Sequence, residues 1–163
     1  MTLSPLLYPF LVVLSGAILC LLLPLWSGRR NLVVAALVAA ATIGITLMLA
    51  WRQWHAGGAA PVPMLTADRL TFFAEIVLAI GAALGIGLAL HQEGHRDLPG
   101  SELIALILFS TFGMILVAAS GDLFVAFLGM EILSLAVYVL AGLARSRPVS
   151  NEAALKYFAL GAF

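Results

Sequence analysis

The sequence is short of charge. Only 10% of its 163 residues are Asp, Glu, Lys or Arg, against about 25% in a typical soluble domain. Because 63% of the residues are hydrophobic, the chain cannot cover a water-facing surface with polar side chains. We therefore predict an integral membrane protein with an all-α fold, a polytopic bundle of transmembrane helices. The formal net charge is zero, which gives no indication of a nucleic-acid partner.

Cysteine is almost absent as well, with Cys20 as its single occurrence. One cysteine excludes an internal disulfide and any metal site built from several thiolates. We interpret Cys20 as a packed helix residue, because a free cysteine behaves as a small apolar side chain. No ligand set for haem, flavin or an iron–sulfur cluster is apparent, so we predict neither a cofactor nor a metal site in this chain.

Long, predominantly apolar runs are the main feature that the sequence does have. They cover residues 4–26, 31–51, 70–90, 103–119 and 122–144, and each is close to the length that crosses a bilayer. A sixth helix is expected after them, capped by Ser150 or Asn151. Because the sequence ends at Phe163, within that helix, we expect it to be the N-terminal portion of a longer membrane protein.

Small residues recur at four-residue spacing on two of these runs. The second run has Ala36, Ala40 and Gly44, and the third has Gly81 and Gly85. Such spacing is typical of faces where membrane helices approach each other closely. We therefore predict that these two faces are packing surfaces.

Basic residues are unevenly divided between the connecting loops. The first, third and fifth loops hold Arg29, Arg30, Arg96, Arg145 and Arg147, whereas the second and fourth hold only Arg52 and Arg69. Positive loops favour the cytoplasmic side of the membrane. The distribution predicts that the N-terminus lies outside the cytoplasm.

Three charged residues fall inside the predicted spans: Glu75, Glu131 and Lys156. Glu75 lies near the beginning of the third run, where a carboxylate can reach the membrane interface or neighbouring helix ends. Glu131 would lie roughly 14 Å from the beginning of its helix, too deep for that. A charge at such depth is costly and is usually paired, protonated or functional.

Glu131 shares one helix face with aromatic, hydroxyl-bearing and small residues, by the i, i+3, i+4, i+7 rule. The face contains Phe124, Phe127, Glu131, Ser134, Tyr138 and Gly142. We predict that Glu131 takes part in proton translocation, with Ser134 and Tyr138 as a supporting polar path. The alternative is a structural glutamate that forms a hydrogen bond with a neighbouring helix.

Lys156 begins roughly 9 Å inside the sixth helix and allows two interpretations. It could belong to the same proton path, bridged to Glu131 by two or three waters, because the offset along the membrane is roughly 10 Å and too long for a direct bond. It could equally pair with Glu152, four residues before it, or extend to the membrane surface.

The sequence around these residues resembles a known family. GDL at 121–123, FLGMEILSL at 127–135, YVL at 138–140, NEAALKYF at 151–158 and LGAF at 160–163 closely resemble subunit N of bacterial NADH–quinone oxidoreductase, respiratory complex I. The match is specific over residues 120–163. Upstream, the similarity extends only to hydropathy and topology.

This resemblance implies an antiporter-like fold with two inverted repeats of about five helices each, including broken helices. Residues 1–163 would then form one transmembrane domain, with three leading helices over 1–100 and the start of the first repeat over 101–163. The resemblance also implies that Glu131 partners a lysine on a later helix in the first proton channel. A lysine at the position of Lys156 would belong to the polar set near it.

The implied function is proton translocation coupled to electron transfer from NADH to quinone. NADH, FMN, the iron–sulfur clusters and quinone would all be handled by partner subunits, and the partners would be other membrane subunits of complex I in the bacterial inner membrane. Two alternatives remain open. One is a subunit of a multi-subunit cation/proton antiporter, and the other is a structural scaffold that conducts nothing.

Overall fold

The structure is a computed structural model that describes residues 4–27, 31–57, 62–66, 68–92 and 99–161. The described residues form helices, with two isolated bridges as their only β-structure. The helices are α1 (Leu7–Ser27), α2 (Asn31–Ala56), α3 (Arg69–Gln92), α4 (Gly100–Ala118), α5 (Leu123–Ala141) and α6 (Pro148–Gly161). Five of them, α1 to α5, are long and apolar enough to cross a membrane. The prediction of an all-α, multi-pass membrane protein is confirmed.

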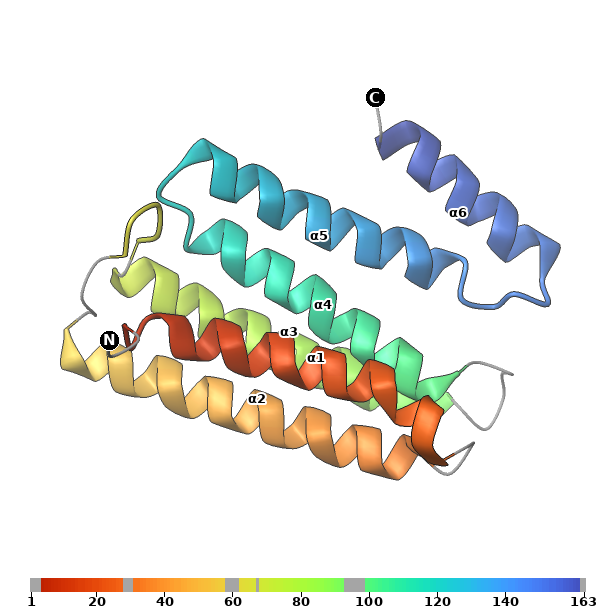
Figure 1. Ribbon diagram of the computed structural model, residues 1–163, viewed down its shortest axis with the longest axis horizontal. Helices are drawn as coiled ribbons and strands as arrows, with labels where there is room; N and C mark the ends of the chain where they lie inside the picture. The colour runs from red at the N-terminus through yellow and green to blue at the C-terminus, as the bar shows by residue number, and fades with distance from the viewer. Residues whose placement is uncertain (1–3, 28–30, 58–61, 67, 93–98, 162–163) are drawn as a thin grey trace.

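Consecutive helices run up and down (Figure 1). The connections α2–α3 and α4–α5 lie at the end where α1 begins, and the α5–α6 connection lies at the opposite end. Helices α1 to α4 form a bundle, α5 lies along α4, and α6 contacts the bundle through α5. Helices α1, α3 and α5 therefore begin on one side of the bundle and end on the other.

The contact between α1 and α2 is built from small side chains. Ala17 and Cys20 of α1 are fully buried, as are Ala35 and Ala39 of α2. The Sγ of Cys20 lies 3.6 Å from the carbonyl oxygen of Ala35, to which it donates. Cys20 is thus a packed helix residue, as predicted.

The small residues noted on the second and third runs mostly lie away from the helix contacts of the described chain, although Ala36 is partly buried against the core. Ala40, Gly44 and Gly81 are exposed, and a Cβ added at Gly44, Gly81 or Gly85 would meet nothing within 4 Å. These close contacts do not form between the described helices, and packing of the two faces against other membrane subunits stays a prediction. The second run has small residues on more than one face, and the bundle buries the face that carries Ala35 and Ala39.

Close backbone approach occurs instead where α4 crosses α5. A Cβ on Gly113 would lie 2.7 Å from both the carbonyl oxygen of Gly129 and the amide nitrogen of Leu133. A Cβ on Gly129 would lie 2.8 Å from Cγ2 of Val117 and 2.9 Å from the carbonyl oxygen of Gly113. No side chain fits at either position, so this crossing depends on two glycines facing each other.

The end of the fifth span and the start of the sixth helix differ from the sequence prediction. Helix α5 ends at Ala141 rather than at residue 144, and Gly142 follows it as C-cap. Helix α6 begins at Pro148, before the predicted caps. Proline suits the first turn of a helix because its missing N–H would have no partner there. Ser150 instead donates its hydroxyl to the carbonyl oxygen of Ala141 at 2.5 Å, which ties α6 to the end of α5.

The α2–α3 connection is attached to the turn between α4 and α5. The amide of Thr66 donates to the carbonyl oxygen of Ala119, and the amide of Gly121 donates to that of Met64, each at 2.8 Å. Asp68 caps α3: the backbone N–H and the hydroxyl of Thr71 both donate to its Oδ1 at 2.8 Å, and these bonds hold the pKa of Asp68 below its usual value. These contacts organise the bundle end from which α5 starts.

Candidate functional site

Helix α5 carries Glu131 near the middle of its apolar span. The helix starts at a well-formed cap, because Oδ1 of Asp122 accepts the amide of Phe124 at 2.7 Å. Glu131 follows this cap by roughly 14 Å along the helix axis, inside the apolar span Leu123–Ala141. Its side chain is exposed and has no hydrogen bond or ion pair with any residue in the described part of the chain. The structure therefore presents a carboxylate on the outer surface of the helix bundle.

The predicted polar face of α5 divides into two parts. Towards the beginning of the helix, Phe127 and Glu131 are exposed. Further along, Tyr138 packs against Tyr157 and Phe158 of α6, with ring centroids 6.0 and 5.9 Å apart. Ser134, between these parts, is partly buried. Helix α6 thus covers the C-terminal half of this face, whereas the side chain of Glu131 remains exposed.

A groove of about 520 Å³ separates α5 from α6. Its lining is Leu135, Tyr138, Val139, Gly142, Asn151, Ala154, Leu155 and Phe158. Tyr138 and Asn151 are its two polar side chains, and no charged side chain lines it. The predicted path from Ser134 to Tyr138 leads towards this groove.

Lys156 forms an ion pair within α6. Its Nζ lies 2.5 Å from Oε1 of Glu152, and both side chains are mostly exposed. The α6 residues that meet α5 include Ala154, whose Cβ approaches Gly142. Two residues on from Ala154, Lys156 lies about 200° around the helix and therefore on the far side from α5. The structure does not bring Lys156 and Glu131 together.

Glu75 differs from the sequence interpretation. A carboxylate reaching the membrane interface would be solvent-accessible, but Glu75 is 0% exposed and points into the bundle with Phe72 and Ala79. Neither carboxylate oxygen has a hydrogen-bond partner among the described residues. The interface interpretation is therefore wrong. Helix α3 is apolar around most of its circumference, so the sequence carries no signal for the face that turns inwards.

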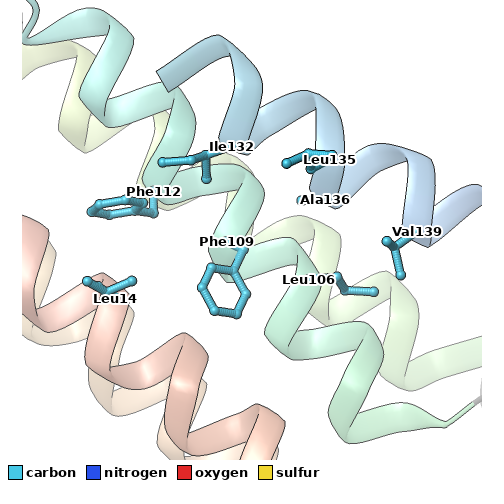
Figure 2. A pocket seen from close by; sticks show the side chains of 8 residues that line it. All are labelled: Leu14, Leu106, Phe109, Phe112, Ile132, Leu135, Ala136 and Val139. Carbon is cyan, nitrogen blue, oxygen red and sulfur yellow. The ribbon is translucent and has the colours of Figure 1, made fainter. Parts of the chain in front are cut away.

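An apolar pocket lies between α1, α4 and α5, and Glu131 is not part of its lining. Figure 2 shows Leu14 of α1 facing Ile132 and Leu135 of α5, with the aromatic rings of α4 between them. Its volume is about 310 Å³, and all its lining side chains are apolar: Leu14, Leu106, Phe109, Phe112, Ile132, Leu135, Ala136 and Val139. Nothing in this lining can carry a proton.

The described side chains do not form a recognisable metal-binding site. Among residues 4–27, 31–57, 62–66, 68–92 and 99–161, no three or more His, Cys, Asp or Glu side chains come together in a way that could hold a metal ion. The chemistry that the arrangement does offer is proton uptake and release by single carboxyl groups in an apolar helix bundle.

Comparison with known proteins relates the chain to one group. Residues 120–163 match the family model described as "NADH:quinone oxidoreductase/Mrp antiporter, TM". The chain is 33% identical to NADH-quinone oxidoreductase subunit N of Gemmatimonas aurantiaca, over 96% of this chain and 32% of the relative. It is 37% identical to the subunit N of Deinococcus radiodurans, over 98% of this chain and 33% of the relative.

A further relative, NADH-quinone oxidoreductase subunit N 1 of Sorangium cellulosum, is 46% identical over 62% of this chain and 20% of its own length. The chain thus spans about a third, or less, of the length of the curated relatives described here. The similarity extends beyond residues 120–163 into the leading helices, where the sequence alone offered only hydropathy and topology.

Proposed function

This chain belongs to the family of membrane-spanning subunits shared by NADH:quinone oxidoreductases and Mrp antiporters, and from that membership we propose that it translocates protons as part of an NADH–quinone oxidoreductase. Glu131 is the residue proposed to carry the proton. The observation that supports this is its position: a carboxylate at mid-membrane depth on α5, without a partner in the described part of the chain. Intramembrane carboxylates are costly and are commonly part of proton or ion paths.

The path continues, in this proposal, along Ser134 and Tyr138 to the groove between α5 and α6. Two alternative roles are proposed for Lys156. Its ion pair with Glu152 supports a structural role within α6, whereas its position in the matched segment supports membership of the polar set near the path. A cation that partners Glu131 directly would have to come from outside the described residues.

The chain is proposed to have no redox centre of its own. NADH, FMN, iron–sulfur clusters and quinone would be bound by partner subunits, and other membrane subunits of complex I would be its neighbours. The division into three leading helices over residues 1–100 and the start of an antiporter-like repeat over 101–163 is part of the same proposal.

Purification tests the proposed assembly. The full-length protein, tagged and extracted in mild detergent, should bring other membrane subunits and NADH–quinone reductase activity with it. Many of its large apolar side chains are exposed along α1 to α5, which fits a subunit that is surrounded by lipid and partner helices. A well-behaved isolated monomer without reductase activity would contradict the proposal. Proton flux driven by a cation gradient, without NADH, would instead favour an antiporter subunit.

We further propose the bacterial inner membrane as the location, with the N-terminus outside the cytoplasm, because the odd-numbered loops hold most of the arginines. Single cysteines test this in a Cys20→Ser background. Ala56→Cys should react with a membrane-impermeant maleimide in intact cells, and Ser146→Cys only in inverted vesicles, because the two positions lie at opposite ends of the bundle. The reverse labelling pattern would overturn the orientation.

A further inference from the structure

Glu75 is a buried carboxyl group that the proposed proton path does not use. It is 0% exposed, and neither of its oxygens has a hydrogen-bond partner in the described part of the chain. An ionised carboxylate in such surroundings is disfavoured far more strongly than a neutral acid. The buried carboxyl group of Glu75 therefore requires either a hydrogen-bonding partner or a bound proton to be stable.

A second unsatisfied polar atom lies on the neighbouring helix. Gln53 of α2 is 7% exposed, and its Nε2 donates to the carbonyl oxygen of Pro5 at 3.0 Å. Its Oε1 is buried without a partner among the described residues. Gln53 is thus held in place by the turn before α1, while its acceptor oxygen has no partner in the described part of the chain.

The two side chains belong to the same layer of the bundle. Helices α2 and α3 are antiparallel neighbours, and the rings of Trp54 and Phe73 lie 6.5 Å apart. One step back along α2 from Trp54 reaches Gln53, and two steps forward along α3 from Phe73 reach Glu75. The two residues therefore lie at similar levels, within about one helical turn (~5.4 Å) of each other along the axis, and both side chains are buried in the bundle.

We propose that Glu75 and Gln53 form an internal proton-binding site, in which Glu75 holds the proton and Oε1 of Gln53 accepts it directly or through one water. If Glu75 is ionised, its two oxygens and Oε1 of Gln53 are three acceptors without a matching donor. One proton on Glu75 turns an acceptor into a donor and satisfies two of these atoms. This site lies in the leading helices and is separate from Glu131 on α5.

The surroundings contain no buried charge that would keep Glu75 ionised. The titratable and charged side chains that the described elements place at this end of the bundle are all exposed: Tyr8, Arg52, His55, Asp68, Arg69 and Asp122. Helix α4 has one charged residue, Glu102, and it lies at the opposite end of the bundle, near Arg145. Leu6, just before α1, and Phe72, one turn before Glu75 on α3, belong to one buried apolar cluster.

Infrared spectroscopy of the assembled complex in lipid tests the site. The parent minus Glu75→Gln difference should contain one carboxylic-acid C=O band that shifts in heavy water. The matched control Asp68→Asn, which changes an exposed carboxylate on the same bundle end, should remove no band in that region. Gln53→Leu should move the Glu75 band to higher frequency, because the acceptor of its O–H is lost.

Each other result overturns the proposal. Loss of carboxylate bands in Glu75→Gln would show that Glu75 is ionised. Failure of Glu75→Gln to assemble would also contradict a neutral acid, because glutamine has nearly the same shape and also carries no charge. A Glu75 band that is unchanged in Gln53→Leu would exclude Gln53 as the acceptor.

Discussion

Glu131→Gln should lower NADH-driven proton uptake in inverted membrane vesicles by roughly tenfold or more, since a positioned proton-transfer group typically contributes about 10²–10⁴-fold. The reductase activity coupled to pumping should fall with it. Glutamine retains the size and hydrogen-bonding capacity of the side chain but cannot release a proton. Glu131→Asp, which is one methylene shorter, should retain part of the activity because it can still ionise.

Assembly has to be measured alongside, on a native gel, because a lost subunit would also abolish uptake. Asp122→Asn is the matched control on the same helix: it too replaces a carboxylate by an amide, and asparagine caps a helix nearly as well as aspartate. This control should pump at the parental rate. If Glu131→Gln assembles and pumps at that rate as well, Glu131 is structural and the proposed proton path is wrong.

Gly129→Ala should strongly reduce the amount of assembled protein. The added methyl group would lie 2.8 Å from Cγ2 of Val117 and 2.9 Å from two backbone atoms of α4, so α4 and α5 must move apart. Overpacking of this kind typically costs about 1–3 kcal/mol. Because Gly129 lies two residues before Glu131 on α5, any surviving protein should also carry a displaced carboxylate. Quantitative blotting of the membrane-extracted complex measures the loss.

Gly81→Ala provides the matched control, because Gly81 is also a glycine within a membrane-spanning helix but has open space around it. Alanine is the better helix former by about 1 kcal/mol, so this change should be neutral or slightly favourable. Gly113→Ala should resemble Gly129→Ala, since its methyl group would lie 2.7 Å from the carbonyl oxygen of Gly129. Normal assembly of both α4 and α5 variants would show that the crossing tolerates a side chain.

The sequence by itself determined the helices, their up-and-down order and the depth of Glu131. These follow from the lengths of the apolar runs, because a bilayer requires about 20 apolar residues per crossing and leaves no backbone group unpaired within it. The motif around Glu131 also predicted the family. Local chemistry shifted only the boundaries, as at Pro148, whose ring begins α6 before the predicted caps.

Only the tertiary structure decided which faces turn inwards. In a soluble helix the apolar stripe indicates the buried side, but a membrane helix is apolar all round and has no such stripe. The sequence therefore could not show that Glu75 is buried, that Lys156 points away from α5, or that Gly113 and Gly129 face each other while Gly81 and Gly85 do not. These positions depend on packing between whole helices, because each helix can rotate about its axis without changing its hydropathy.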